Sequence, residues 1–408
     1  KLERLQVRYA TYFSPLRQLS LGNLPLDKNT RYGRIVIGEQ KKGATMLVNK
    51  SSLQLILSNV MRYVPSRTTI PILSYVHLQC KDGSLYVSGT NLSASYEART
   101  QVGTEKFDIC VPGKTLSDLL AKISDDAVSL SVDEKTLTLI VQYGRSKSKV
   151  KGMSGDEFPL TKQDFKTQFF VSSNELREIL PFALFSASND NSHPILTGVK
   201  FQCENNTLSL FAADGFRASI VQKETTLPDF TIVVPAISLS SLRLPEDEML
   251  EFGIDDNVMM IKGSDFTFTT QLIDGVFPDV LRIVPKEYLN TVTVEAIFLQ
   301  RAVEATMVFS RDVANIVKLV LWKDTVSVKG ASSEIGDGEN IVDLEASTFT
   351  EVGAFTIGVN GGYLLDVLRH SPTAMIEIHF NQSTNPIGFS YPGKCEFTHI
   401  LMPMHVAG

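Results

Sequence analysis

Residues 193–219 read HPILTGVKFQCENNTLSLFAADGFRAS and predict two β-strands joined by a polar turn at residues 204–206. An Asp-Gly pair at residues 214–215 predicts a tight turn after the second strand. The same pattern stands 123 residues earlier, where PILSYVHLQC occupies residues 71–80 and aligns Cys80 with Cys203. A fainter copy, VKLVLW, begins at Val317, which lies 118 residues after Val199. The chain is therefore predicted to contain one β-rich unit three times.

Two further markers recur in the same order. Residues 107–112, 230–235 and 355–360 read FDICVP, FTIVVP and FTIGVN, and each precedes a short apolar pattern with helical spacing. The pairs Phe-Pro, Phe-Pro and Met-Pro at residues 158–159, 277–278 and 402–403 close the three units. We expect an α+β fold of three repeated domains, each with two helices against antiparallel sheets. Their expected bounds are 46–163, 164–286 and 287–408, after an N-terminal extension at 1–45.

The first helix of a unit is predicted to follow a short strand. In the first unit Ser51 and Gln54 have the spacing of a capping box, with Ser51 as the N-cap. In the second unit Ser172 and Glu175 have the same spacing. Apolar residues at 53, 56, 57, 60 and 61 then predict the buried face of the first helix.

Composition excludes several classes of protein. Hydrophobic residues make up 43% of the chain, which is ordinary for globular domains, and no apolar run approaches the roughly 18 residues of a membrane helix. The start does not resemble a secretory signal. The four cysteines are unclustered, and Cys80 and Cys203 fall on predicted strands as small buried residues. We therefore expect neither disulfides nor a metal site, and no cofactor.

Charge is uneven along the chain. Residues 1–45 hold nine Lys and Arg against three Asp and Glu, whereas the remainder carries a net charge of −12. The extension could be a targeting segment or an arm that touches DNA. The alternative is a tag or a misassigned start, and this alternative is favoured because Met46 opens the first repeat.

No known catalytic motif is present in the sequence. It has no P-loop, HExxH, CxxC or GxSxG pattern. Asp214 with His193 could serve a hydrolase, but the repeat counterpart of Asp214 is Asn91, so a turn role is favoured. Residues 336–340, GDGEN, lack the spacing of a calcium loop and are predicted to form a surface turn.

Four motifs of the chain occur in the same order in one protein family. They are HPILTGV at 193–199, ADGFR at 213–217, GVFPD at 275–279 and MPM at 402–404. From Met46 to Val406 the chain resembles the β subunit of bacterial DNA polymerase III, the sliding clamp. The resemblance implies the DNA clamp fold and no catalytic activity. Two crescent-shaped monomers would close head to tail into a dimeric ring around duplex DNA. It also implies a cytoplasmic protein that binds the polymerase III alpha subunit, the clamp loader and other proteins with a clamp-binding motif, and no membrane.

The repeats agree with this resemblance independently. Three copies of a two-helix, sheet-backed unit can form half of a pseudo-sixfold ring, and head-to-tail contacts close when the rotation completes a circle. Sheets joined edge to edge would also cover their exposed edges.

Basic residues on the repeated helices are the expected DNA-facing set, because a protein that slides should contact phosphates rather than bases. The resemblance adds Arg67, in the loop after the first helix. The complete set is Arg62, Arg67, Lys114, Lys122, Arg177, Arg243, Arg301 and Arg369.

By motif match, the family's partner-peptide pocket would lie between the second and third units. An apolar cleft with flexible methionines suits short linear motifs. Three positions depart from the family, namely Phe216 for a usual histidine, Ala218 for a larger aliphatic residue and His405 for a basic residue. The expected pocket residues are Leu196, Thr197, Gly215, Phe216, Arg217, Pro278, Arg282, Ile283, Asn360, Tyr363, Ile400, Met402, Pro403 and Met404.

The ring interface would join the edge segment that contains Ser148 and Val150 to Val308 and Phe309 of a second copy. Ser148 stands where the family commonly has an aromatic residue, so the interface is expected to be weaker or more polar. Two alternatives stay open: a monomeric scaffold that kept the fold but not the ring, and a repeat-built hydrolase.

Overall fold

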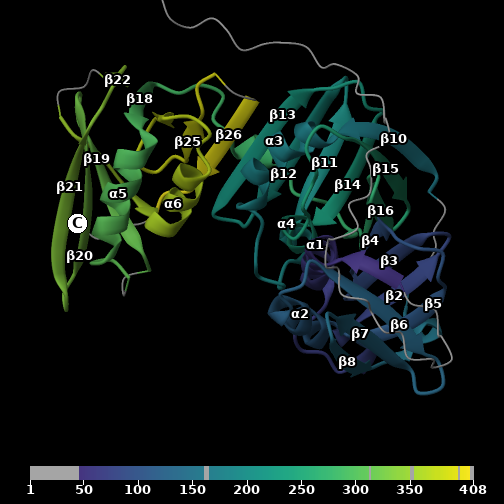
Figure 1. Cartoon of the computed structure of the whole chain (residues 1–408). Helices are drawn as coiled ribbons and strands as arrows, with labels where there is room; N and C mark the ends of the chain where they lie inside the picture. The colour runs from purple at the N-terminus through teal and green to yellow at the C-terminus, as the bar shows by residue number, and fades with distance from the viewer. Residues whose placement is uncertain (1–45, 160–164, 312–313, 350–352, 394–395, 405–408) are drawn as a thin grey trace, which may run out of the picture. The chain divides into compact units, whose positions relative to one another are not determined.

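The computed structural model describes residues 46–159, 165–311, 314–349, 353–393 and 396–404. Within these residues one arrangement of two helices and two antiparallel sheets occurs three times (Figure 1). We name the copies the first, second and third units, using the predicted bounds. Residues 1–45 and His405 lie outside the described residues, so the structure says nothing of the predictions that fall there.

The three units share one order of elements, apart from the short additional strands β9 in the first unit and β22 in the third. The first unit contains β1 (Met46–Asn49), α1 (Lys50–Val60), β2 (Tyr75–Lys81), β3 (Ser84–Thr90), β4 (Ala94–Gln101), β5 (Phe107–Pro112), α2 (Gly113–Lys122), β6 (Ala127–Asp133), β7 (Thr138–Tyr143), β8 (Ser146–Lys151) and β9 (Met153–Ser154). The second contains β10 (Thr167–Ser172), α3 (Ser173–Leu184), β11 (Gly198–Glu204), β12 (Thr207–Ala213), β13 (Arg217–Glu224), β14 (Phe230–Pro235), α4 (Ala236–Ser240), β15 (Met249–Asp255), β16 (Val258–Lys262) and β17 (Phe266–Gln271). The third contains β18 (Asn290–Glu295), α5 (Ala296–Met307), β19 (Ile316–Leu321), β20 (Thr325–Ser332), β21 (Gly336–Asp343), β22 (Ala346–Ser347), β23 (Phe355–Asn360), α6 (Gly361–Arg369), β24 (Met375–Phe380), β25 (Ile387–Ser390) and β26 (Glu396–Leu401).

Local sequence explains most element ends. Asn205 and Asn206 both have positive φ, 51° and 60°, as a tight hairpin turn requires, and so the predicted turn between β11 and β12 is confirmed. The predicted cap of α1 is wrong by two residues. Asn49 is the N-cap, because its extended backbone lets its side chain accept the Ser52 N–H at 3.0 Å, whereas Ser51 already lies in the helix. Ser172 does occupy the N-cap position of α3, as predicted, but its side chain makes no capping hydrogen bond to the described residues.

The sheets of neighbouring units join edge to edge. One nine-stranded sheet joins β17 of the second unit to β4 of the first, and the other joins β26 of the third unit to β13 of the second. We call these junctions the first seam and the second seam. Two four-stranded sheets remain, with the strand orders β1-β6-β7-β8 in the first unit and β21-β20-β19-β23 in the third, so that β8 and β21 each lie unpaired at one edge.

The two seams differ in their packing. At the first seam the Tyr63 ring stacks on Tyr96 at 5.4 Å and contacts Phe268 at 5.5 Å, and its hydroxyl donates to the Ser238 carbonyl at 3.2 Å. At the second seam Ser219 Oγ lies 2.7 Å from Ser186 Oγ and 2.9 Å from His399 Nδ1, and the Phe182 ring contacts Phe397 at 5.6 Å. The second seam therefore adds a buried hydrogen-bonded group to its aromatic contacts.

The helices pack in pairs against the sheets. In the third unit α5 contacts α6 and lies on one side of the sheet that contains β20 and β21 (Figure 1). Cys80, Cys110 and Cys203 are buried and unpaired, as expected for the two of them on repeated strands. No helix in the described part of the chain is long and apolar enough to cross a membrane.

Candidate functional site

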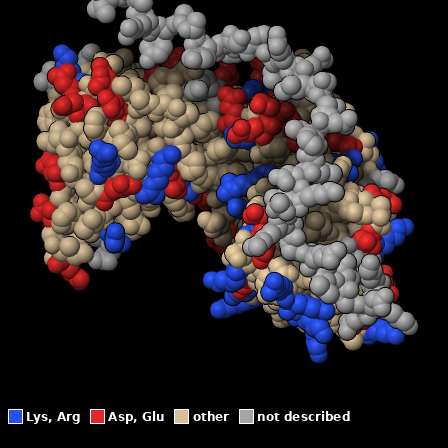
Figure 2. Space-filling model, viewed as in Figure 1, with Lys and Arg blue, Asp and Glu red and all other residues tan. Residues whose placement is uncertain are grey.

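The predicted DNA-facing cations are exposed, but not all of them lie on helices. Lys114 and Lys122 belong to α2, and Arg177, Arg301 and Arg369 belong to α3, α5 and α6. Arg62 lies in a 3-10 turn (Met61–Tyr63), because α1 ends at Val60, and Arg67 lies in the loop beyond. The helical placement of Arg243 is wrong, since α4 has only five residues and ends at Ser240. Figure 2 shows Lys and Arg side chains gathered over α2 and β8.

Two of these cations already form ion pairs with carboxylates of the same chain. Arg177 Nη2 lies 2.8 Å from Glu246 Oε1, and Arg369 Nη2 lies 2.8 Å from Glu304 Oε1. The hydrogen bond from Arg369, followed by that from Gln300, holds the pKa of Glu304 below its ordinary value. Both pairs are partly exposed, so their net strength is small. They nevertheless reduce the positive charge that the two helices offer to a phosphate.

The predicted pocket residues come from five segments that meet near the second seam. Leu196 and Thr197 lie in a 3-10 turn (Pro194–Thr197), and Arg282 and Ile283 lie in another (Val280–Ile283). The other three segments are the turn at residues 214–217, the start of α6, and the end of β26 with the residues that follow it. Leu196 packs against a small buried cluster that includes Phe277 and Val280.

Asp214 forms the turn that the sequence predicts. Its Oδ1 accepts the N–H groups of Phe216 and Arg217 at 2.9 and 3.0 Å, and Gly215 has φ +92°. Its Oδ2 accepts Arg217 Nε at 2.9 Å. Both oxygens are thus committed to the turn, and no hydrogen bond joins Asp214 to His193 among the described residues. The geometry therefore gives no support to the hydrolase alternative.

Arg217 links the second unit to the third. Its side chain is only 7% exposed, and its Nη1 donates to Asp366 Oδ2 on α6 at 2.6 Å. Its guanidinium lies over the Tyr363 ring at 4.3 Å, a cation–π geometry. Because Asp214 and Asp366 both hold it, little of its charge is available to a bound partner.

The segment that follows β26, residues 402–404, is hydrogen-bonded to the same turn and to β23. The Met402 N–H donates to the Phe216 carbonyl at 2.9 Å, and the Met404 N–H donates to the Gly358 carbonyl at 2.8 Å. The Phe216 ring is 59% exposed and lies 6.3 Å from the Tyr363 ring. Ile400 has no exposed surface, so in this conformation it supports the surface from beneath.

Sequence reasoning missed three residues of this region. Val276 is 91% exposed and Leu281 is also exposed, which enlarges the apolar surface beside Pro278 and Ile283. Asp366 was missed because only the structure shows that it bonds Arg217. The run GVFPDVLRIV, at residues 275–284, carries enough apolar residues to have indicated the first two.

The unpaired strands β8 and β21 carry opposite charge. Lys147, Lys149 and Lys151 are exposed on β8, whereas Asp337, Glu339 and Asp343 are exposed on β21. Figure 2 shows acidic side chains along the β21 edge. The two edges are therefore complementary in sign.

The predicted ring-interface residues lie at these two edges. Val150 is 6% exposed, so it offers little apolar surface, and the Ser148 hydroxyl lies 3.0 Å from the Tyr143 hydroxyl. Val308 caps the C-terminus of α5 and is half exposed. Phe309 covers Gly338 of β21 so closely that a Cβ there would lie 2.6 Å from its ring.

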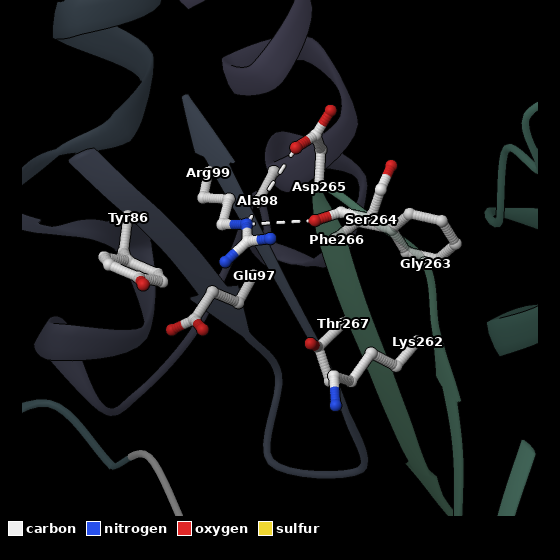
Figure 3. A pocket seen from close by; sticks show the side chains of 10 residues that line it. All are labelled: Tyr86, Glu97, Ala98, Arg99, Lys262, Gly263, Ser264, Asp265, Phe266 and Thr267. Atoms are coloured by element: carbon white, nitrogen blue, oxygen red, sulfur yellow. Dashed lines mark hydrogen bonds and ion pairs between the residues drawn. The ribbon is translucent and has the colours of Figure 1, made fainter. Parts of the chain in front are cut away.

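A polar pocket of about 200 Å³ lies at the first seam (Figure 3). Arg99 Nε donates to the Ser264 carbonyl at 2.9 Å and lies 3.9 Å from Asp265 Oδ1, which ties β4 to the turn before β17. Arg99 and Lys262 balance Glu97 and Asp265 in charge. We interpret the pocket as part of the seam. Among the described residues, no group of three His, Cys, Asp or Glu could hold a metal ion.

Comparison with known proteins gives a consistent result. The sequence matches the family description "DNA polymerase III beta subunit" in three parts: its N-terminal domain over residues 44–162, its central domain over 170–279 and its C-terminal domain over 281–405. The beta sliding clamp of Haemophilus influenzae is 27% identical over 369 residues, which cover 88% of this chain and 99% of the relative. That of Staphylococcus aureus strain Mu50 is 24% identical, over 85% of this chain and 96% of the relative.

Solved structures have the same fold. A sliding clamp from Pseudomonas aeruginosa bound to griselimycin matches with a TM-score of 0.82 and 23% identity, over 90% of this chain and 100% of its own. The DNA polymerase III beta subunit of Thermotoga maritima matches with a TM-score of 0.79 and 22% identity, over 89% of this chain and 100% of its own.

Proposed function

The chain belongs to the DNA polymerase III beta subunit family, and from that premise we propose that it is a sliding clamp. Two copies form a closed ring around duplex DNA and tether the replicative polymerase, its loader and other proteins with a clamp-binding motif. The protein encloses the DNA, offers docking surfaces to its partners and catalyses no reaction. Its place of action is the cytoplasm, where the DNA is replicated.

The observation that carries this proposal is the pattern of sheet edges. Each unit has two sheets, and within the chain one sheet of a unit pairs with the next unit at each of the two seams. The unpaired strands β8 and β21 occupy the positions that the paired strands occupy elsewhere. A second copy supplies the missing partner to both, and repetition of one rotation closes the ring. Closure also covers these two exposed edges, which would otherwise favour aggregation.

The eight exposed cations on the helices and in the segments that follow them form the DNA surface of this proposal. Six of the eight, Arg62, Arg67, Lys114, Lys122, Arg243 and Arg301, have no carboxylate within ion-pair distance in the described part of the chain, whereas Arg177 and Arg369 are partly neutralised. A net charge of −12 outside residues 1–45 disfavours tight binding to DNA by charge alone. Weak, exchangeable phosphate contacts inside a closed ring let the protein slide without dissociating.

The surface around Phe216, Tyr363 and Met402 is the proposed docking site for partner peptides. It combines exposed apolar side chains with flexible methionines, which adapt to different short motifs. Phe216 fills space that a smaller side chain would leave open, so smaller apolar anchors are favoured here. All fourteen predicted pocket residues remain part of this proposal, with Arg217 and Ile400 acting from beneath.

Primer extension tests the proposal. The cognate polymerase copies a primed circular single strand of several kilobases with its clamp loader and ATP, with or without this protein. We expect products several-fold longer when the protein is present. A chain truncated before Met402 should lose this effect although it still forms dimers. Equal product lengths with and without the intact protein would contradict a role as processivity factor.

A further inference from the structure

Residues that lie directly opposite one another on successive strands form a row across each sheet. Comparing the rows of the three units shows which residues on the edge strands are equivalent. In the first sheet of each unit, the row begins four residues before the first helix and ends on the edge strand. The three rows are Met46–Leu130–Val141–Ser148, Phe169–Phe252–Ile261–Phe268 and Val292–Ile378–Phe389–His399. Ser148 on the unpaired strand β8 is therefore equivalent to Phe268 and His399 on the paired strands.

The second sheet of each unit gives a matching set. Here the row begins three residues before the second helix and ends on the other edge. The rows are Cys110–His77–Ser88–Glu97, Val233–Lys200–Phe211–Ile220 and Gly358–Lys318–Lys329–Glu339. Glu339 on the unpaired strand β21 is therefore equivalent to Glu97 and Ile220.

Both seams use the same register. At the first seam Thr267, one residue before Phe268, lies opposite Glu97. At the second seam Thr398, one residue before His399, lies opposite Ile220. At both seams, the residue that precedes the last residue of a first-sheet row in the sequence lies opposite the last residue of a second-sheet row. The same rule for the register can be applied to β8 and β21.

We propose that β8 of one copy pairs with β21 of a second copy in this same register, with Lys147 opposite Glu339 and Lys149 opposite Asp337. The inference rests on the proposed ring and adds its register and its chemistry. Both lysines and both acidic side chains are exposed on the unpaired edges. Glu339 accepts a hydrogen bond from the Ser327 hydroxyl and lies 3.0 Å from Lys329 Nζ of its own chain, and these two contacts hold its pKa below the ordinary value. Lys147 would therefore share this carboxylate with Lys329, and both lysines are at least partly exposed.

The same rule describes the apolar part of the interface. Tyr63 stands thirteen residues after the start of α1, and Phe309 stands thirteen residues after the start of α5. Phe309 is thus equivalent to the ring that packs on Phe268 at the first seam, and in the dimer it faces Ser148. One aromatic ring replaces the three of the first seam, since Gly338 and Ser148 stand where Tyr96 and Phe268 do. The interface should therefore depend on charge and weaken with added salt.

Reversal of charge tests the register. Lys147→Glu and Glu339→Lys should each raise the dimer dissociation constant by at least about tenfold, because like charges would stand opposite each other. Mixed in equal amounts, the two singly substituted chains should form a heterodimer, since each interface of a head-to-tail pair then joins opposite charges. The measurement is molar mass by size exclusion with light scattering at micromolar concentration. Melting temperatures check that each variant is folded.

A shifted pair is the matched control. Asp337→Lys mixed with Lys147→Glu should not restore the dimer, because these positions are offset by two residues. Restoration by Asp337→Lys but not by Glu339→Lys would overturn the register and leave the ring intact. Dimers unaffected by either single substitution would also overturn it. Monomers of the unsubstituted protein would instead refute the proposed ring itself.

Disulfide formation gives a second readout. Residues directly opposite on antiparallel strands have Cβ atoms about 4.5–5.5 Å apart, whereas diagonal neighbours lie about 7–8 Å apart. Lys147→Cys combined with Glu339→Cys in one chain should give covalent dimers on oxidation. Lys147→Cys combined with Asp337→Cys should give far fewer. Equal yields, or the reverse order, would contradict the proposed pairing.

Discussion

His399 should make the second seam sensitive to acid. The side chain has no exposed surface, and its Nε2 has no hydrogen-bond partner among the described residues. Burial, and then the positive charge of Arg217, lower the pKa of His399 from 6.5 to about 3. The folded protein therefore keeps this imidazole neutral where the unfolded chain would protonate it.

The size of the effect follows from proton linkage. Between pH 6.5 and about 3 the unfolded chain binds a proton at His399 that the folded chain does not, so the free energy of unfolding falls as the pH falls. Within this range, each unit by which the pH falls lowers the free energy of unfolding by about 1.4 kcal/mol. At pH 5 the loss from this one residue is about 2 kcal/mol relative to neutral pH.

Urea unfolding at pH 7.5 and pH 5 measures this decrease in the free energy of unfolding. His399→Gln keeps a hydrogen-bonding side chain near Ser219 but cannot be protonated in this range. The free energy of unfolding of this variant should therefore fall by about 2 kcal/mol less between the two pH values than that of the unsubstituted protein. His193→Gln, at an exposed position, is the control and should behave like the unsubstituted protein. Equal losses in all three proteins would refute the account of a neutral buried His399.

Three other predictions test separate parts of the structure. Glu304→Gln should release Arg369 and steepen the salt dependence of DNA binding by roughly one unit in a titration with short duplex DNA, and a shallower slope would contradict the ion pair's effect. Tyr63→Phe removes the hydroxyl that bonds the Ser238 carbonyl across the first seam, and should lower the free energy of unfolding by about 1 kcal/mol. An unchanged urea midpoint would show that this bond contributes nothing. Truncation before Met402 should weaken binding of a polymerase peptide with leucine and phenylalanine anchors by at least tenfold, about 1.4 kcal/mol, and equal affinity in a peptide titration would exclude this surface.

The repeated architecture could be predicted because it depends on local patterns. Apolar alternation and the recurring Phe-rich and Pro-containing markers fix the strands, and the two asparagines at 205–206 fix a hairpin turn. The first residue of α1 could not be predicted from sequence, because Asn49, Ser51 and Ser52 are all residues that can cap a helix. Only the extended backbone at Asn49 shows that this residue is the N-cap. The length of α4 was similarly overestimated, which misplaced Arg243.

The roles of single residues were harder to predict than the fold. Arg217 was assigned to the pocket from its motif, but its buried ion pair with Asp366 joins positions 149 residues apart, which no local pattern shows. The register of the seams is also non-local, because it requires pairing between strands of different units. The family resemblance predicts Ser148 and Phe309 as interface residues, whereas only the sheet rows relate them to Phe268 and Tyr63.

The protein is proposed to stay on DNA by enclosing it, and its retention on circular and on linear DNA tests this most directly. The protein is loaded onto a nicked circular plasmid with its clamp loader and ATP, separated from free protein by gel filtration at moderate salt, and divided into two portions. One portion is cut once with a restriction enzyme before a second gel filtration. We predict that the protein elutes with the uncut circles and is lost from the linear DNA. Equal retention on both forms, or none on the circles, would contradict the account.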